Sequence, residues 1–64
     1  MTTNTLNAVA EYKKTLAVFA TQTANANAEV RITWNVWLYQ RTTEIAAAFG
    51  TTTDAIVTAW QMAA

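Results

Sequence analysis

The side chains that could take part in acid–base or metal chemistry are few and scattered. There are four carboxylates, at Glu11, Glu29, Glu44 and Asp54, and the sequence contains no serine, cysteine or histidine. Without these three residue types, a nucleophile–base triad of the usual kind cannot form. A single glycine leaves no loop that could cradle a phosphate. We therefore expect no enzyme activity, no cofactor, no metal site and no small-molecule substrate.

The length and composition of the chain limit the kind of fold that can position its side chains. A chain of 64 residues forms one domain at most and buries only about 60% of its unfolded surface. Because no cysteine is available for a disulfide, stability has to come from regular helix packing or from self-association. The expected organisation is a single helical domain over residues 1–64.

The sequence shows no feature that would take the chain into or across a membrane. No apolar run approaches the roughly 18 residues that a membrane helix needs. Residues 1–6 lack the basic and apolar regions of a secretory signal. We therefore expect a cytoplasmic protein without a membrane partner.

The first predicted element is a helix over residues 4–22, because its apolar residues recur at steps of three and four. These residues are Leu6, Val9, Tyr12, Leu16 and Phe19. Thr3, Asn4 or Thr5 can cap its start by accepting a free backbone N–H. Residues 21–28, rich in threonine and asparagine, are predicted to be a linker because such side chains compete with the helix for backbone hydrogen bonds.

The segment 29–39 is compatible with two structures. At a period of two residues it resembles a strand, because alternate positions are apolar. At helical spacing, Val30, Trp34, Trp37 and Leu38 form one stripe, and Ile32, Val36 and Tyr39 cover the opposite side. A helix that is apolar on two sides is either central in a fold or part of an oligomer interface. We favour the helix, and a strand that pairs with its copy in a dimer is the open alternative.

A further short helix is predicted over residues 43–49. Thr42 is placed to cap it, and Glu44 near its start would complement the helix dipole.

The last predicted helix spans residues 53–62. Gly50 can adopt the left-handed conformation that ends the preceding helix, and Thr52 can cap the new one, with Asp54 in its first turn. The expected fold class is all-α: a small bundle of three to four helices over 4–22 and 29–62, ending in a helical corner.

The segment 42–62 resembles the helix-turn-helix family of DNA-binding proteins. The positions that carry the resemblance are Ile45, Ala46, Phe49, Gly50, Thr52, Ile56 and Ala59. In that family a small residue, here Ala46, lies where the second helix crosses the first, and a glycine, here Gly50, forms the turn. The resemblance covers about a third of the chain and implies a helix-turn-helix corner.

The same resemblance implies that the last helix reads double-stranded DNA in the major groove. The residues it assigns to DNA are Thr52, Thr53, Asp54, Val57, Thr58 and Gln61, with Arg41 close by. The chain departs from the family in one respect, because this helix contains no lysine or arginine. Most DNA affinity comes from neutralising phosphates, so few contacts imply weak binding.

A weaker resemblance links the chain to ribbon-helix-helix proteins, which begin with a strand. In that arrangement Val30, Ile32 and Trp34 would face inward, and Glu29, Arg31 and Thr33 would face the bases. Asn35 would then cap the first helix of the unit.

The three tryptophans, Trp34, Trp37 and Trp60, are core candidates first and interface candidates next, since tryptophan is enriched at interface hot spots. Two functions therefore stay open. One is a small, dimeric DNA-binding transcription regulator of the kind that phages and mobile elements use. The other is a protein-interaction or self-assembling helical subunit, which the zero net charge favours.

Overall fold

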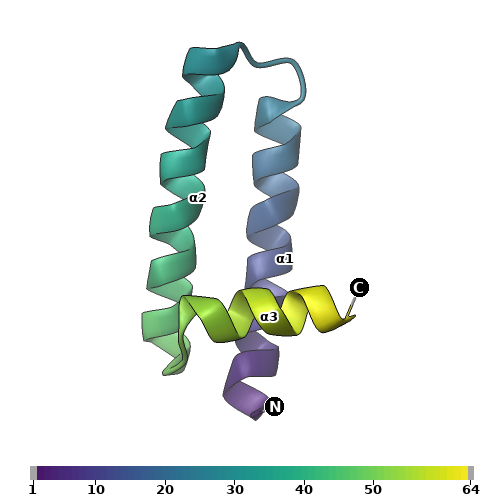
Figure 1. The fold of residues 1–64 in the computed structure, drawn as a ribbon, viewed down its shortest axis with the longest axis vertical. Coiled ribbons are helices and arrows are strands. Elements are labelled where there is room, and N and C mark those ends of the chain that lie inside the picture. The colour runs from purple at the N-terminus through teal and green to yellow at the C-terminus, as the bar shows by residue number, and fades with distance from the viewer. Residues whose placement is uncertain (1, 64) are drawn as a thin grey trace.

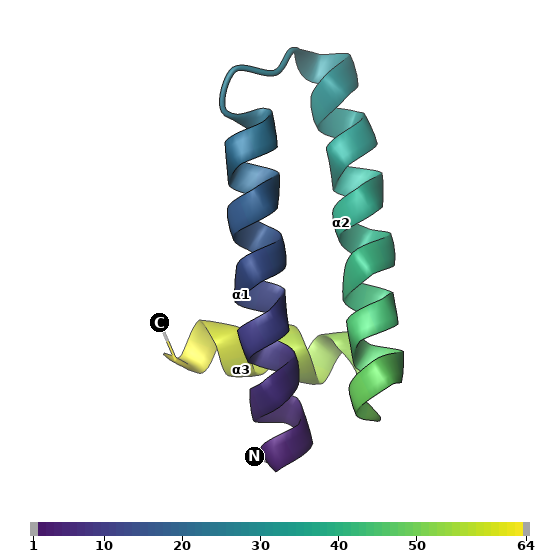
Figure 2. The same cartoon turned by 180° about the vertical axis from the view of Figure 1, so that it is seen from behind.

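The computed structural model describes residues 2–63, and these form three helices with no strand among them. Helices α1 (Thr3–Thr23) and α2 (Ala28–Phe49) run antiparallel as a long hairpin. Helix α3 (Thr53–Ala63) crosses the hairpin near the start of α1 and the end of α2, as Figure 1 and Figure 2 show from opposite sides. The predicted all-α fold is confirmed, with three helices rather than four.

Helix α1 starts earlier and ends later than the sequence suggested. Its cap is Thr2, whose Oγ1 accepts a hydrogen bond from the Thr5 N–H at 3.1 Å, so the predicted caps at positions 3–5 were wrong. At the other end, the hydroxyls of Thr21 and Thr23 donate to the carbonyls four residues back, at 3.0 and 2.7 Å. These hydrogen bonds satisfy the threonine hydroxyls within the helix, so the threonines continue α1 instead of ending it. The predicted linker at 21–28 therefore shrinks to the turn at 24–27.

Helix α2 is continuous where two helices were predicted. Asn27 caps it by accepting the Val30 N–H at 3.0 Å, and residues 29–39 are helical rather than extended. The strand of the ribbon-helix-helix arrangement is therefore absent from this segment. Thr42 does not cap a new helix, because it is buried inside α2 and its hydroxyl donates to the Leu38 carbonyl at 2.7 Å. Glu44, predicted near a helix start, consequently lies within α2 as well.

The chain turns sharply after α2 because Gly50 takes the left-handed conformation, with φ 65° and ψ 36°. The Thr51 N–H then donates to the Ala46 carbonyl at 2.9 Å, which satisfies one of the free carbonyls at the helix end. Thr52 Oγ1 accepts the Ala55 N–H at 3.1 Å and starts α3. The predicted glycine stop and the Thr52 cap are both confirmed.

The core lies where α3 crosses the hairpin. Its buried apolar residues are Ala8, Val9 and Tyr12 from α1, Ile45 and Ala46 from α2, and Ile56 and Ala59 from α3. A hydrogen bond of 3.1 Å between the hydroxyls of Thr5 and Thr51 ties the start of α1 to the turn before α3. We call this part the base: residues 3–15, 42–49 and helix α3.

The rest of the hairpin, residues 16–41, has no third helix and is called the arm. None of its side chains is buried. Leu16, Phe19, Trp34, Trp37 and Leu38 are half-buried between or beside the two helices. The arm is therefore held by one helix–helix contact, whereas the base is held by three.

Candidate interaction surface

Six of the seven residues predicted to contact DNA lie on α3 or at its start. Thr52, Asp54, Thr58 and Gln61 are exposed, and Thr53 and Val57 are half-buried. Helix α3 packs on the hairpin through Ile56 and Ala59, both buried. The structure thus leaves Asp54, Thr58 and Gln61 exposed along α3, whereas Thr52 precedes the helix as its cap.

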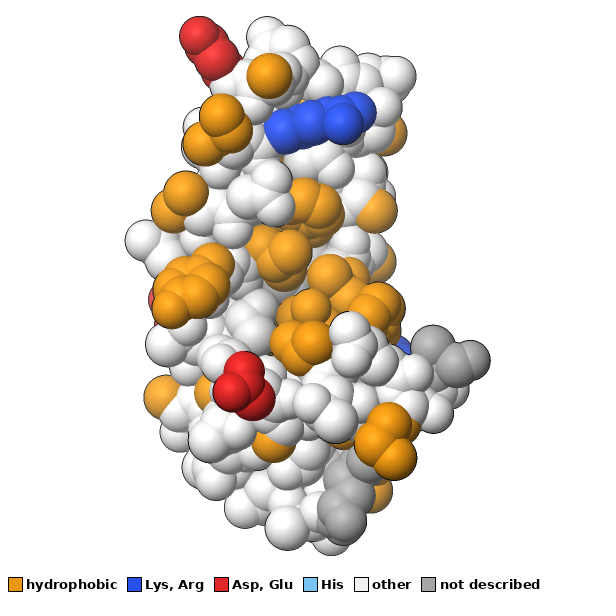
Figure 3. Space-filling view, in the orientation of Figure 1, with side chains coloured by type: hydrophobic (Ala, Val, Ile, Leu, Met, Phe, Trp, Pro, Cys, Tyr) orange, Lys and Arg blue, Asp and Glu red, His pale blue; other side chains and the backbone are white. Residues whose placement is uncertain are grey.

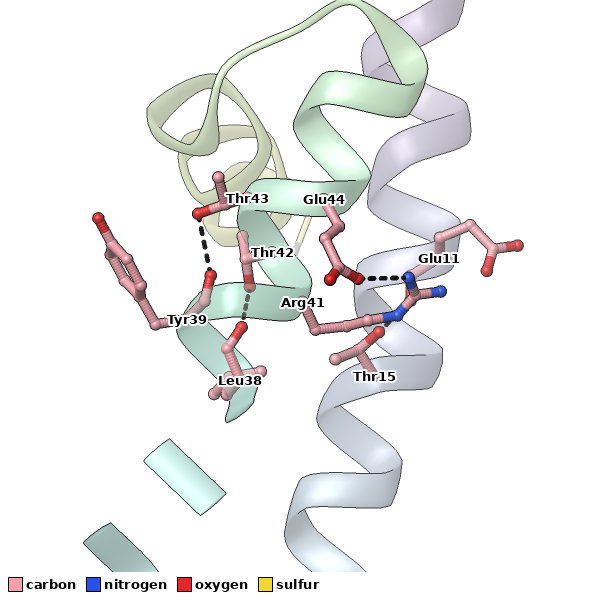
Figure 4. Close-up of polar contacts among 8 residues, drawn as sticks. All are labelled: Glu11, Thr15, Leu38, Tyr39, Arg41, Thr42, Thr43 and Glu44. Atoms are coloured by element: carbon pink, nitrogen blue, oxygen red, sulfur yellow. Dashed lines mark hydrogen bonds and ion pairs between the residues drawn. The ribbon is translucent and has the colours of Figure 1, made fainter. Parts of the chain in front are cut away.

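The seventh residue, Arg41, is not part of that group. It lies on α2 and its Nη1 donates to Glu44 Oε2 at 3.2 Å. Figure 4 shows the side chain extending toward α1, beside Glu11 and Thr15. Arg41 therefore belongs to a different surface from the predicted DNA-binding residues.

The charges near α3 do not form a positive surface. Asp54 is the only ionisable side chain within the described residues of α3. Lys14 donates to Glu11 Oε1 at 3.4 Å, so two of the four cations, Lys14 and Arg41, are engaged with carboxylates. Lys13 is the cation that lines a groove with the C-terminal half of α3, beside Ala59 and Met62. A phosphate backbone laid on α3 would meet one acidic group and at most one nearby lysine.

The three tryptophans occupy two different settings. Trp60 packs edge-on against Tyr12 at the edge of the core, with ring centroids 5.9 Å apart. Trp34 and Trp37 pair edge-on with each other at 5.0 Å, on the arm. All three are half-buried, so none is wholly hidden and none is fully available as an anchor.

An open cleft of about 460 Å³ forms where the three helices meet. It is lined by Tyr12 from α1, by Asn35, Leu38, Tyr39 and Thr42 from α2, and by Thr53, Asp54 and Val57 from α3. Figure 3 shows hydrophobic side chains gathered between α1 and α2 just above α3. The cleft was not predicted from the sequence, because its walls come from three helices and their crossing depends on tertiary packing.

A second apolar feature runs along the outside of α2. Ile32, Val36 and Tyr39 are 64%, 52% and 73% exposed. Their spacing of four and three residues places them within a sector of about 60° on the helix. Figure 4 shows the Tyr39 ring directed away from α1, and Tyr39 also lines the cleft. We call these three residues the outer stripe, and it is continuous with the cleft.

The outer stripe was visible in the sequence as the second apolar side of the segment 29–39. The structure shows that this side faces outward, with no other helix over it. Its residues were not among the predicted site residues, because a two-sided apolar helix is equally typical of a central core helix.

Residues 2–63 contain no group of three or more histidine, cysteine, aspartate or glutamate side chains that could hold a metal ion. Nor does any helix in this range combine the length and apolarity that crossing a bilayer requires. No protein-family model matches the chain, and no curated protein or solved structure matches it either. The function is therefore inferred from the surface itself.

Proposed function

We propose that the protein is a non-enzymatic interaction module that docks a protein helix on the outer stripe and the adjoining cleft. The observation that carries the proposal is the exposure of Ile32, Val36 and Tyr39 together on one side of a regular helix. Scattered apolar residues are normal on a surface, but a contiguous apolar strip is typical of an interaction site. A helix that lays its own apolar face along α2 would remove all three side chains from water.

The chemistry around the outer stripe favours an apolar partner surface. No charged residue lies between Arg31 and Arg41. The cleft beside the stripe offers the apolar side chains of Leu38 and Val57, with Asn35 and Thr53 as uncharged polar groups and Asp54 as its one charged group. Depletion of charge at the centre of a contact surface is the compositional mark of protein interfaces.

The proposal is tested by placing a photo-crosslinking phenylalanine analogue at position 36 of the full chain in cells. A matched control carries the same analogue at position 14, which is exposed on α1 and distant from the stripe in sequence. We expect a defined protein adduct from position 36 and none from position 14. The partner identified by mass spectrometry is then purified, and its binding should be lost with Val36→Lys. The absence of any adduct at position 36 would overturn the proposal.

A second function, a small helix-turn-helix regulator that binds double-stranded DNA, is supported by the corner at Gly50. The left-handed glycine, the Thr52 cap and the inward Ile56 and Ala59 match what the family resemblance implies. Thr58 and Gln61 then remain exposed and could contact base edges. This function ranks second because the cations that would neutralise phosphates are few and partly paired.

The DNA function is tested by fluorescence anisotropy with short duplexes, including the sequence upstream of the protein's own gene, at low salt. One or two phosphate contacts give a slope of log K against log salt of about −1 to −2. Thr58→Ala should change sequence preference, whereas Lys13→Gln should weaken binding to all duplexes alike and lower the salt slope. No binding at low salt to any duplex would exclude this function.

A further inference from the structure

We propose that the partner of the outer stripe is a second copy of the same chain, docked antiparallel to the first along α2. This inference rests on the proposed interaction function and specifies which molecule binds the stripe. It follows from three properties of the stripe: its position on the molecule, the distribution of charge around it, and its area.

The outer stripe lies on a side of α2 that is open to a body as large as another copy. Tyr39 points away from α1 in Figure 4, and the stripe residues share its side of the helix. Figure 1 and Figure 2 show α3 crossing only the lower end of the hairpin, so the arm part of α2 has one helical neighbour. Figure 3 shows hydrophobic side chains along this outer edge. A second α2 could therefore approach without displacing α1 or α3.

The charge pattern suits a copy of the same surface. In a two-fold interface both chains use the same surface patch. A charged residue close to the two-fold axis would therefore face its own copy and be repelled by it. The neighbours of the stripe on this side are Thr33, Asn35, Gln40 and Thr43, all uncharged. Glu29, one turn before Ile32, is the nearest charged residue of α2 on this side, and Asp54 of α3 lines the cleft together with Tyr39.

Glu29 also decides the direction of the pairing. With a two-fold axis between positions 35 and 36, the two Glu29 side chains of an antiparallel pair lie at opposite ends, about 20 Å apart at 1.5 Å per residue. That separation exceeds the Debye length of about 8 Å at physiological salt. In a parallel pair they would lie side by side and repel. The antiparallel pairing sets Ile32 opposite the second copy's Tyr39 and places Val36 near the axis.

The area available is enough for a weak dimer. Given their exposure, the three stripe residues offer roughly 350–400 Å² per chain. A specific interface needs about 500 Å² per partner. The four uncharged neighbours can supply the remainder. We therefore expect a dimer with a dissociation constant in the micromolar range or weaker, as is usual for interfaces of the smallest class.

The chain's lack of cysteine makes the pairing directly testable by disulfide crosslinking. The full chain is prepared as Ile32→Cys, as Tyr39→Cys and, for comparison, as Val18→Cys, which is exposed on α1. One variant of each mixture carries a mass tag. We expect the mixture of Ile32→Cys and Tyr39→Cys to form the mixed disulfide at least ten times faster than either variant crosslinks with itself. Mixtures with Val18→Cys should show no such preference.

Sedimentation equilibrium of the unmodified chain gives an independent measurement. We expect a concentration-dependent dimer that Val36→Lys abolishes and that Met62→Lys, a matched change at an exposed residue of α3, leaves intact. Circular dichroism confirms that both variants keep their helices. A monomer at millimolar concentration, or self-crosslinking of Ile32→Cys as fast as the mixture, would overturn the inference.

The photo-crosslinking experiment separates this inference from the proposed function. An adduct of position 36 with a second copy supports both. An adduct with a different protein, together with a monomeric chain, would leave the interaction function standing and reject the dimer. No adduct of either kind would reject both.

Discussion

The base and the arm are made from the same two long helices, yet they bury their side chains very differently. In the base, α3 closes over the hairpin, and six apolar residues are buried together with Ile56, which is completely enclosed. In the arm the same α1 and α2 continue without α3, and no side chain from residue 16 to residue 41 is buried. One added helix of 11 residues marks the difference between a core and an open hairpin.

The comparison shows that the buried residues that stabilise the fold and the apolar residues that stay exposed lie in different parts of the hairpin. A small domain gains most of its stability from the few residues it can enclose, and here these all lie in the base. The arm stays helical through its caps, the packing of α1 against α2 and its connection to the base. Its apolar side chains, including the outer stripe, are therefore free to contact another molecule. The predictions below test this division, beginning with the largest effect.

The largest expected effect is that of Ile56→Ala in the base, set against Ile32→Ala in the arm. Removing a completely buried isoleucine side chain leaves a cavity and should lower the free energy of unfolding by about 3 kcal/mol. Ile32 is mostly exposed, so Ile32→Ala should lower it by less than about 0.5 kcal/mol. Urea unfolding followed by circular dichroism at low micromolar concentration, where a weak dimer dissociates, measures both. Equal losses would mean that the arm contains a core of its own.

The next effect concerns the turn that folds α3 onto the base. Gly50 has a φ of 65°, and a Cβ placed there would meet no atom within 4 Å. The cost of Gly50→Ala is therefore conformational, about 1–2 kcal/mol, because L-residues disfavour the left-handed region. Gly50→Asn should cost clearly less, since asparagine tolerates that region better. Thermal unfolding measures the difference, because the unfolding midpoint should fall by about 4–8 °C for each kcal/mol lost. An equal fall for Gly50→Ala and Gly50→Asn would contradict the prediction.

Much of the fold could be predicted from local sequence patterns. The predicted apolar stripe of α1 was right for Val9 and Tyr12, which are buried, and wrong for Leu6, which is 54% exposed. Gly50 and Thr52 predicted where α2 ends and α3 begins. These predictions succeeded because a helix face and a cap depend on residues that are close in sequence.

The errors have a common physical cause in the threonines. Six of them donate their hydroxyl to the carbonyl four residues earlier, and these are Thr15, Thr21, Thr23, Thr33, Thr42 and Thr43. A threonine can thus either cap a helix or continue it, and sequence alone does not distinguish Thr52, which caps, from Thr42, which continues. For this reason α2 was divided in two and α1 was ended too early.

The candidate surface was predictable only in part. The two apolar sides of the segment 29–39 follow from helical periodicity, so the existence of the outer stripe could be inferred. Which side would face outward depends on how α1 packs against α2, and the joining of Tyr12, Leu38 and Val57 into one cleft depends on where α3 crosses the hairpin. These features depend on contacts between residues far apart in sequence.

A smaller effect is expected from the two helix caps, one in each region. Thr52→Ala removes the cap of α3 in the base and should lower the free energy of unfolding by about 1 kcal/mol. Asn27→Ala removes the same kind of hydrogen bond at the tip of the arm. Because a helix end remote from the core can fray by itself, this change should leave the unfolding midpoint nearly unaltered. It should instead speed the hydrogen exchange of the first amides of α2, and a midpoint shift as large as that of Thr52→Ala would show that the arm unfolds together with the base.

The smallest effect is expected from the two ion pairs near the boundary between base and arm. Both join residues three apart on one helix and both are exposed, so each is worth only about 0.2–0.5 kcal/mol. Their order along the helix differs. In α1, Glu11 precedes Lys14, which is the favourable order, whereas in α2 Arg41 precedes Glu44. Glu11→Gln should therefore lower stability slightly more than Glu44→Gln, and both losses should vanish in 1 M salt, where screening is nearly complete. A larger loss that survives high salt for Glu44→Gln would show that Glu44 contributes to the packing of the base and not only to an ion pair.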